Sequence, residues 1–517
     1  MDKMTLKEKI GQMIMTGFPS SVITPEILEL ITEYKISNII LFSYNLENVN
    51  QIQELCKELN SIIQENTGYP AFIAIDQEGG VVSRLPKDMN NIPGAMLIGA
   101  TDKEEYAYRA GVITGEELSA LGINMDLAPV LDVNNNPNNP VIGVRSYSND
   151  PDKVARFGVN MMKGLHSAGV MSTVKHFPGH GDTAVDSHLG IPVIEKDFDQ
   201  LMECELLPFV QAIQEGAPCV MSSHILFPKL EKENKPATMS KAILTDILRH
   251  KLMFKGIIMT DCMEMGAIKD YYGTAKGAVE ALKAGAQIIT VSHTPELVKE
   301  TIHLIEEGVR NGEIPLKLID AAVENIIRYK ETYKNRFTEN KLEATYSEKY
   351  KKEISKIAEE GIVKVTNQEL PSIKEDILFI SPYAYQSTLA SSAVNKNLHF
   401  AKYMSTKFGG KSVEIPINPD QQVIAEVLKQ VDKNSLVVCG LYNGHMNYGQ
   451  IELVNRIKES GNSVIAITLR NPTDLALLHD DVHKLAGFEY NETVFEAIVK
   501  ILKKDISPIG KLPVKLC

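Results

Sequence analysis

Ionisable side chains recur at the ends of short apolar runs in the first half of the chain. Five consecutive runs, AFIAID, MDLAPVLDV, STVKHF, CVMSSHI and GIIMTD, contain or precede such residues. These residues are Asp76, Glu78 and Arg84; Asp126, Asp132 and Arg145; Lys175, His176, His180, Asp182, Asp186 and His188; His224; and Asp261 and Glu264. One charged residue at a strand end usually only faces solvent, but five such ends in a row indicate a site. Carboxylates, histidines and cations placed together can transfer protons, attack a substrate and bind its polar groups.

The segment KHFPGHGDTAVDSH, after the fifth strand-like run, allows three interpretations. His176 and His180 have the H-x₃-H spacing of some metal ligands, but the Gly and Pro residues between and around them interrupt the required helix, so we expect no metal. Gly179 and Gly181 could instead form a tight loop whose side chains satisfy buried backbone groups, which we prefer for His180 and Asp182. The third interpretation is glycoside chemistry, with a nucleophilic carboxylate from one strand and a proton donor from another.

The elements that must position these residues can be read from the spacing of apolar side chains. Eight short runs, apolar on both faces, alternate with longer amphipathic stretches; they cover residues 12–18, 38–42, 71–76, 125–133, 172–177, 219–225, 256–261 and 287–292. Such runs are typical of strands buried in a parallel sheet. Eight of them predict an α/β fold of the (β/α)₈ barrel type, with a doubly wound open sheet as the alternative. In a barrel the carboxyl ends of all strands meet at one face, where active sites lie.

The remaining third of the chain predicts a second domain. Residues 332–353 are polar and charged, and we interpret them as a solvated linker or helix face. After them, five or six further strand-like runs alternate with helices, which predicts a smaller three-layer α/β sandwich. The predicted boundaries are 1–334 for the barrel, 335–352 for the linker and 353–517 for the sandwich.

Composition narrows the classes of partner and compartment. The 517 residues carry a net charge of −12, so no basic surplus points to nucleic acid or to an anionic membrane. No stretch approaches the roughly 18–20 apolar residues of a membrane span. The six cysteines are scattered without a C-x-x-C pair, which argues against a zinc ribbon or a disulfide framework. With no secretion signal in the first residues, we expect a cytoplasmic protein that acts on a small substrate, as a monomer or homodimer.

The ordered set of motifs resembles the family 3 glycoside hydrolases, more narrowly their bacterial β-N-acetylhexosaminidase branch in its two-domain form. The segment KHFPGHGDTAVDSH carries the resemblance, with DQEGG upstream and GIIMTD downstream. The segments TNQELPSI (366–373) and GKLPV (510–514) also resemble the two-domain members. The resemblance implies that Asp261 is the nucleophile and that Asp186 and His188 form the acid/base pair. It implies sugar-binding roles for Asp76, Arg84, Asp126, Arg145, Lys175 and His176.

The residue types agree with these implied roles. Cleavage with retention needs a carboxylate beneath the anomeric carbon and a proton for the leaving oxygen. Asp261 ends an apolar strand, and a histidine such as His188 titrates near neutral pH, as an acid that later acts as a base should. Asp186, two residues away, can hold the imidazole in one tautomer. Lys175 and the arginines could also pair with nearby carboxylates, and both roles are compatible.

We therefore predict a retaining, exo-acting β-N-acetylglucosaminidase that needs no cofactor. Its expected substrates are GlcNAc-containing oligosaccharides, either cell-wall fragments, as in peptidoglycan recycling, or chito-oligosaccharides. One alternative is a β-glucosidase or a phosphorylase of the same family, because a histidine acid/base tolerates an anionic acceptor. Another is a non-catalytic sugar-binding protein, although Asp261 and the Asp186–His188 pair argue against it. The second domain would be a structural, dimerising or substrate-rim element.

Overall fold

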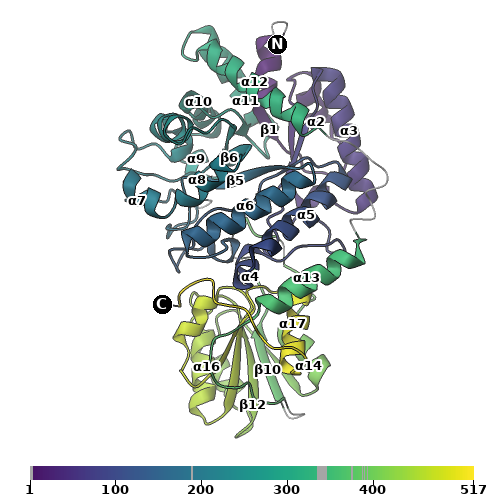
Figure 1. Ribbon diagram of the computed structural model, residues 1–517, viewed down its shortest axis with the longest axis vertical. Coiled ribbons are helices and arrows are strands. Elements are labelled where there is room, and N and C mark those ends of the chain that lie inside the picture. The colour runs from purple at the N-terminus through teal and green to yellow at the C-terminus, as the bar shows by residue number, and fades with distance from the viewer. Residues whose placement is uncertain are drawn as a thin grey trace.

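The protein is represented by a computed structural model that describes residues 4–187, 190–334, 346–373, 377–386, 388, 390–392 and 394–516. Figure 1 shows two α/β bodies stacked along the long axis of the molecule. The larger body is built from the N-terminal part of the chain, and helix α13 (Glu348–Gly361) lies where the two bodies meet.

Eight parallel strands form the larger body's sheet, in the order β7-β6-β5-β4-β3-β2-β1-β8. They are β1 (Ile14–Thr16), β2 (Asn38–Leu41), β3 (Phe72–Ile75), β4 (Met125–Asp126), β5 (Met171–Phe177), β6 (Cys219–Ser222), β7 (Ile257–Thr260) and β8 (Ile289–Thr290). A parallel bridge between Met259 and Ile288 joins the two edge strands and closes the barrel. The predicted (β/α)₈ barrel is thus confirmed, and each predicted strand overlaps one observed strand.

Every residue of these eight strands is buried, which explains why their sequences are apolar on both faces. Helices cover the outside of the barrel: α1 (Leu6–Met13), α2 (Pro25–Thr32), α3 (Val49–Thr67), α4 (Ala95–Ala100), α5 (Glu104–Leu121), α6 (Pro151–Ser167), α7 (Phe198–Glu203), α8 (Leu207–Gln214), α9 (Gly266–Lys269), α10 (Thr274–Ala284), α11 (Pro295–Arg310) and α12 (Leu316–Thr332). A helix of π type, Ala242–Lys251, precedes β7.

Local sequence sets where the helices begin and end. The Thr24 side chain accepts a hydrogen bond from the backbone of Ile27, with Pro25 in the first turn of α2. Asn48 caps α3 in the same way, and Gly68 ends that helix at φ 77°, a conformation that favours glycine. In α12 the buried residues Ile319, Val323 and Ile326 recur at helical spacing and turn one apolar face toward the barrel.

The smaller body contains a six-stranded sheet in the order β11-β10-β12-β13-β14-β9, parallel except for β9. Its strands are β9 (Val363–Lys364), β10 (Ile377–Pro382), β11 (Lys411–Ile415), β12 (Leu436–Leu441), β13 (Ser463–Thr468) and β14 (His483–Ala486). Its helices, besides α13, are α14 (Phe400–Phe408), α15 (Gln421–Leu428), α16 (Gly449–Glu459) and α17 (Glu492–Leu502). In Figure 1, α16 lies on one side of this sheet and α14 and α17 lie on the other, as the predicted α/β sandwich requires.

The segment predicted as a linker is partly helical. Residues 335–345 lie outside the described residues, but α13 begins at Glu348, inside the predicted range 335–352. Ser347 caps this helix by accepting a hydrogen bond from the backbone of Tyr350. The charged residues at the start of α13 therefore lie on the solvent face of a helix. The domain boundaries themselves stay a prediction.

The two bodies are joined by polar contacts from both ends of the smaller one. From α13, Glu360 pairs with Lys103 at 2.6 Å. From the C-terminal segment 510–514, the carbonyl of Pro513 accepts a hydrogen bond from the Ser148 hydroxyl at 2.5 Å, and the backbone nitrogen of Lys511 donates to Ala100 at 2.7 Å. The segment that resembles two-domain family members thus packs against the barrel.

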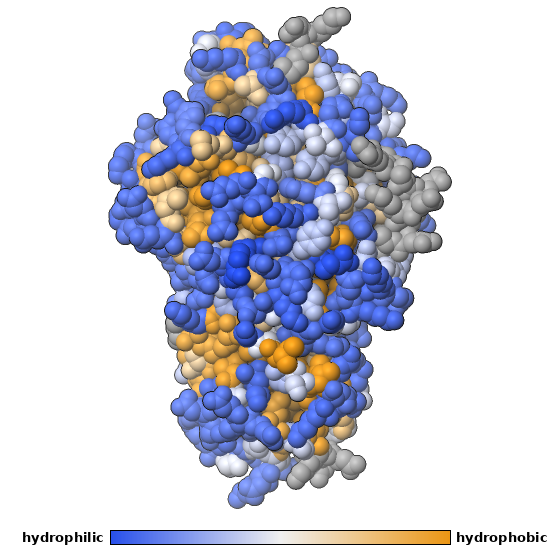
Figure 2. Space-filling model, in the orientation of Figure 1, coloured by the Kyte–Doolittle hydropathy of each residue, from blue (hydrophilic) through white to orange (hydrophobic). Residues whose placement is uncertain are grey.

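The visible surface is mostly hydrophilic, with separate apolar areas on the barrel and on the smaller body (Figure 2). This fits a chain with a net charge of −12 and 23% charged residues. Within the described part of the chain, no helix is both long enough and apolar enough to cross a membrane.

Candidate active site

The carboxyl ends of the barrel strands place most of the predicted site residues at one face. Asp76 directly follows β3, Lys175 and His176 lie in β5, and Asp261 directly follows β7. Ile75 lies opposite Asp126 in the pairing of β3 with β4, so the ends of neighbouring strands are level. The barrel geometry therefore brings together residues that are almost two hundred positions apart in the sequence.

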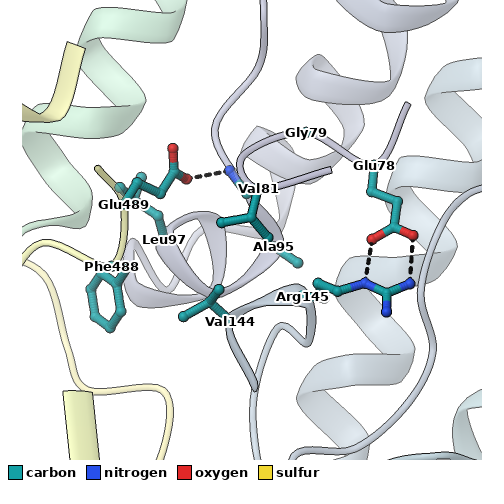
Figure 3. A pocket seen from close by; sticks show the side chains of 10 residues that line it. Glu78, Gly79, Val81, Ala95, Leu97, Val144, Arg145, Phe488 and Glu489 are labelled. Carbon is teal, nitrogen blue, oxygen red and sulfur yellow. Dashed lines mark hydrogen bonds and ion pairs between the residues drawn. The ribbon is translucent and has the colours of Figure 1, made fainter. Parts of the chain in front are cut away.

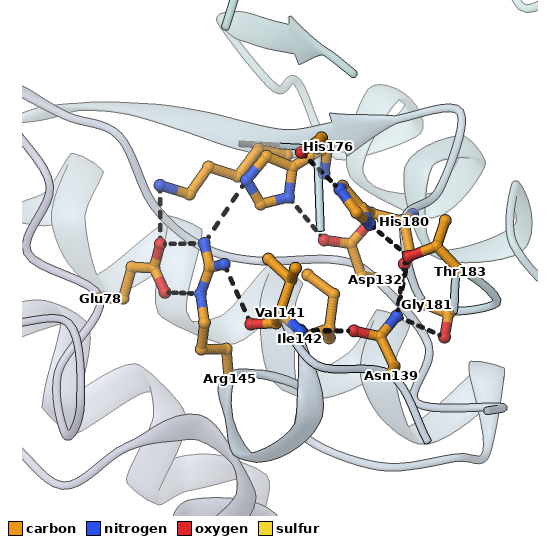
Figure 4. Close-up of polar contacts among 12 residues, drawn as sticks. Glu78, Asp132, Asn139, Val141, Ile142, Arg145, His176, His180, Gly181 and Thr183 are labelled. Atoms are coloured by element: carbon orange, nitrogen blue, oxygen red, sulfur yellow. Dashed lines mark hydrogen bonds and ion pairs between the residues drawn. The ribbon is translucent and has the colours of Figure 1, made fainter. Parts of the chain in front are cut away.

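Four charged side chains, Asp76, Glu78, Arg145 and Lys175, form a compact network at this face, and Figure 4 shows its Glu78–Arg145 pair. The Lys175 Nζ lies 2.7 Å from Asp76 Oδ1 and 2.7 Å from Glu78 Oε1. Arg145 binds Glu78 with two parallel hydrogen bonds, from Nε at 2.8 Å and from Nη2 at 2.7 Å. The Lys175, Glu78 and Arg145 side chains are 6% exposed or less, and buried charges are stable only when paired in this way.

The buried ion pairs hold Glu78, Arg145 and Lys175 in their ionised forms. Burial alone would raise the pKa of Glu78, but the charges of Arg145 and Lys175 and their hydrogen bonds hold it far below its usual range. Burial alone would lower the pKa of Lys175, but the charges of Asp76 and Glu78 outweigh it and raise that pKa. The network thus offers a fixed cation and a fixed carboxylate, Lys175 and Asp76, at the site.

His176 is oriented by a buried carboxylate, Asp132. Its Nδ1 lies 2.6 Å from Asp132 Oδ2, and its backbone nitrogen donates to Asp132 Oδ1 at 3.2 Å. Its Nε2 lies 3.4 Å from Nη2 of Arg145. Burial would raise the pKa of Asp132, but the charge of His176 and the hydrogen bonds from the two histidines outweigh it and lower that pKa.

His180 binds its own loop. Its backbone nitrogen donates to Asp132 at 2.7 Å, while Nδ1 and Nε2 lie 2.9 and 3.1 Å from the hydroxyls of Thr183 and Ser187. Burial, followed by the charge of His176, lowers the pKa of His180 to about 4, so it is neutral at physiological pH. These contacts agree with the structural interpretation of His180.

Asp182 also has a partner in its own part of the barrel, because it pairs with Lys196 at 2.7 Å. The described residues contain no group of three or more His, Cys, Asp or Glu side chains arranged to hold a metal ion.

The predicted nucleophile and acid/base pair are only partly described. His188 and Leu189 lie outside the described residues, while the Asp186 side chain is buried and its carbonyl accepts a hydrogen bond from Gly190 at 3.1 Å. Asp261 is partly exposed, and its Oδ1 accepts a hydrogen bond from the backbone of Cys262 at 2.7 Å. The next carbonyl, of Cys262, accepts from Nε2 of the buried His224 at 2.9 Å. His224 therefore orders the segment that begins with Asp261.

Besides His176, two predicted sugar-binding residues lie outside the ionic network. Arg84 donates to the carbonyl of Ala390 at 2.8 Å and to the hydroxyl of Ser392 at 3.3 Å, so it binds the smaller body. Asp126 is fully buried, its Oδ1 accepts a hydrogen bond from the backbone of Gln77 at 3.0 Å, and burial raises its pKa well above the usual range. Because Gln77 lies between two residues of the network, this contact favours a positioning role for Asp126.

Sequence reasoning gave no role to three residues of the site. Glu78 and Asp132 stand at strand ends but hold the predicted ligands Lys175, Arg145 and His176 in place. Their only signal was a position in or just after an apolar run.

The third residue, Glu489, comes from the smaller body. With Phe488 it lines a small cavity whose other wall includes Glu78 and Arg145 (Figure 3). Its Oε1 accepts a hydrogen bond from the backbone of Gly94 in the barrel, and its Oε2 accepts one from Asn491 at 2.5 Å. Burial raises the pKa of Glu489 to about 7. No sequence signal links it to the barrel loop almost four hundred residues earlier.

Comparison with known proteins gives a consistent set of relatives. The sequence model of the glycosyl hydrolase family 3 N terminal domain matches residues 5–329. Beta-hexosaminidase A of Pseudoalteromonas piscicida is 39% identical over 317 residues, covering 55% of this chain and 53% of that protein. Beta-hexosaminidase of Hydrogenovibrio crunogenus is 32% identical over 295 residues, covering 56% and 81%. The chain thus spans about half the length of the first of these two relatives.

Solved structures extend the similarity to both bodies. A family 3 β-N-acetylglucosaminidase from Paenibacillus sp. str. FPU-7 is 34% identical and covers 99% of both chains with a TM-score of 0.92. The β-glucoside phosphorylase BglX, at 22% identity, covers 99% of this chain and 94% of its own with a TM-score of 0.83, and shares the fold.

Proposed function

The chain belongs to glycosyl hydrolase family 3, and from this membership we propose that it is a β-N-acetylhexosaminidase that releases terminal, non-reducing β-N-acetylhexosamine residues. The observation that carries the proposal is the network of Lys175, Asp76, Glu78 and Arg145 at the face of the barrel where Asp261 directly follows β7. The names of the curated relatives, and of the solved structure that aligns over both bodies, support the hexosamine specificity.

In the proposed reaction a carboxylate oxygen of Asp261 attacks the anomeric carbon, and the bond from that carbon to the leaving oxygen breaks. His188 gives its proton to the leaving oxygen, so the alcohol departs and a covalent glycosyl-Asp261 ester remains. His188 then takes a proton from water, the water attacks the anomeric carbon, and Asp261 leaves with the configuration retained. Asp186 orients the imidazole and stabilises its charged form.

The ionic network supplies the groups that we propose hold the sugar. Asp76 can accept hydrogen bonds from two neighbouring hydroxyls, and Lys175 can donate to a sugar oxygen. Glu78 keeps Lys175 and Arg145 in place through contacts of 2.7–2.8 Å, and Asp132 does the same for His176 at 2.6 Å. Side chains held by buried partners lose little freedom on binding, which is how a site is preorganised.

We further propose GlcNAc-containing cell-wall fragments or chito-oligosaccharides as substrates, with the reaction in the cytoplasm. The test is a panel of 4-nitrophenyl β-glycosides of GlcNAc, GalNAc, glucose and xylose, assayed with and without inorganic phosphate. We expect the highest kcat/KM with a hexosaminide and release of the free sugar. Preference for the glucoside, release of a sugar 1-phosphate, or binding without turnover would each contradict the proposal.

A further inference from the structure

Three aromatic side chains form a continuous shelf at the barrel mouth, over the ends of β2 and β8. Phe42 follows β2, Tyr44 lies two residues later, and His293 lies three residues after β8. The Phe42 and Tyr44 rings are stacked with centroids 5.4 Å apart, and the Phe42 and His293 rings are 5.0 Å apart. We call these three residues the aromatic shelf. Its outer member, Tyr44, is 49% exposed.

The shelf crosses β1, which lies between β2 and β8 in the barrel, and a glycine makes this crossing possible. Gly17 directly follows β1, and a Cβ atom there would lie 2.8 Å from the carbonyl oxygen of Ser292 and 3.2 Å from Cε2 of Phe42. Any other residue would collide with the backbone beside His293 and press on the Phe42 ring. Glycine at position 17 thus leaves the room that the shelf needs.

The turn that carries Tyr44 is held rigidly. The Asn45 side chain accepts a hydrogen bond from the backbone of Phe42 at 2.8 Å and donates to the carbonyls of Phe18 at 2.8 Å and Ser20 at 2.5 Å. A half-exposed ring on a fixed turn loses little conformational entropy when a ligand packs on it.

The shelf is next to the candidate nucleophile. The backbone nitrogen of His293 donates to Glu264 Oε2 at 2.6 Å, and Glu264 follows Asp261 by three residues. The Tyr44 hydroxyl lies within the electrostatic reach of the same segment: burial, then Cys262 and Glu264, raise its pKa to about 12, and Arg84 opposes them. Around the barrel the order is therefore the ionic network at β3–β5, Asp261 at β7, and the shelf at β8, β1 and β2.

We propose that the aromatic shelf is a subsite for the pyranose ring of the leaving group, which packs its C–H face on Tyr44. This inference rests on the proposed function. It adds the residues that would recognise the leaving group of the substrate. The polar groups at β3–β5 suit the hydroxyls of the retained sugar, so the exposed ring on the neighbouring β2 turn is left for the departing one. Aromatic rings bury the apolar faces of ligands effectively, and with no Trp in the sequence, Tyr44 supplies that surface here.

The test compares two donors that deliver the same glycosyl group. N,N′-diacetylchitobiose has a pyranose ring as its leaving group, whereas β-N-acetylglucosaminyl fluoride has none. For each donor kcat/KM reports the steps through departure of the leaving group. We expect Tyr44→Ala to lower the ratio of kcat/KM for chitobiose to that for the fluoride about tenfold, and Tyr44→Phe to keep it within about twofold of wild type. Tyr108→Ala, which removes a ring of similar exposure on the outer helix α5, should leave the ratio unchanged.

The possible outcomes distinguish failure of the proposed subsite from failure of the proposed function. If Tyr44→Ala lowers kcat/KM equally for both donors, Tyr44 acts on the retained sugar or on the fold, and the leaving-group subsite is wrong. If the ratio does not change at all, the shelf makes no contact with the leaving group. If the wild-type protein hydrolyses neither donor, the proposed function itself has failed, which is a different result from an unchanged ratio.

Discussion

The substitution Glu78→Gln tests whether the buried ionic network is the structural basis of the site. Glu78 is the carboxylate shared by Lys175 and Arg145, with three contacts of 2.7–2.8 Å, and its side chain is only 6% exposed. The substitution keeps the size of the side chain but removes its charge, so two buried cations face the single carboxylate of Asp76. Removing one partner of a buried ion pair costs about 3–5 kcal/mol because the other charge stays buried without compensation.

The matched control is Glu215→Gln, which removes the same charge from the half-exposed pair Lys163–Glu215. Exposed pairs contribute about 0–1 kcal/mol, so this variant should unfold like the wild type. Denaturant unfolding followed by fluorescence should show a free energy lower by about 3–5 kcal/mol for Glu78→Gln only. Hexosaminide kcat/KM should also fall for that variant, because Lys175 loses one of its two carboxylate partners.

The difference in unfolding free energy between the wild type and Glu78→Gln should depend on pH. The pKa of Glu78 is lower in the folded state than its ordinary value of 4.5. Its charge therefore stabilises the fold fully above about pH 4.5, and the contribution is lost as the pH falls below that value. The stability gap between the wild type and Glu78→Gln should be constant from pH 7 to pH 5 and smaller at pH 3.5. Equal stability of Glu78→Gln and Glu215→Gln at pH 7 would mean that the buried network does not stabilise the fold.

Two further predictions concern the domain contact and the acid/base pair. Burial raises the pKa of Glu489 to about 7, so its carboxyl destabilises the fold increasingly as the pH rises from about 4.5 to 7. The free energy of unfolding of Glu489→Gln, relative to that of the wild type, should therefore be higher at pH 8 than at pH 5. A difference in unfolding free energy that does not depend on pH would contradict this. His188→Ala should lose about 10²–10⁴-fold in kcat/KM on chitobiose. It should be far less impaired on an aryl glycoside with an acidic phenol, and azide should restore turnover with formation of a β-glycosyl azide; equal loss on both substrates without rescue would mean that His188 is not the proton donor.

Much of the fold could be predicted because its signal is local. A strand buried on both sides is mostly apolar on both faces, so all eight barrel strands stood out as short runs, including β8 with only two residues in strand conformation. The helix α13 was harder to predict, since its buried residues Tyr350, Ile354, Ile357 and Ala358 lie within a run of Lys and Glu. There the charged solvent face dominates the composition and hides the apolar face.

The sequence predicted most of the residues that form the candidate site. It predicted much less well which of them bind one another. Asp76, Lys175, Arg145 and His176 meet at one end of the barrel because the carboxyl ends of parallel strands must meet. Which carboxylate each cation binds depends on loop conformation, so the central position of Glu78 could not be read from the sequence. The contacts of Arg84 with the smaller body depend on packing between segments about three hundred residues apart.

The proposed role of Asp261 as the nucleophile of a retaining hexosaminidase can be tested by trapping the covalent intermediate. The wild-type protein would be incubated with a slow fluorinated N-acetylglucosaminide, digested at low pH and analysed by tandem mass spectrometry. We expect one glycosyl group per chain, attached to Asp261 and absent from Asp261→Asn. Attachment to Asp126 or Glu264, or turnover of the reagent by the Asp261→Asn variant at the wild-type rate, would contradict it.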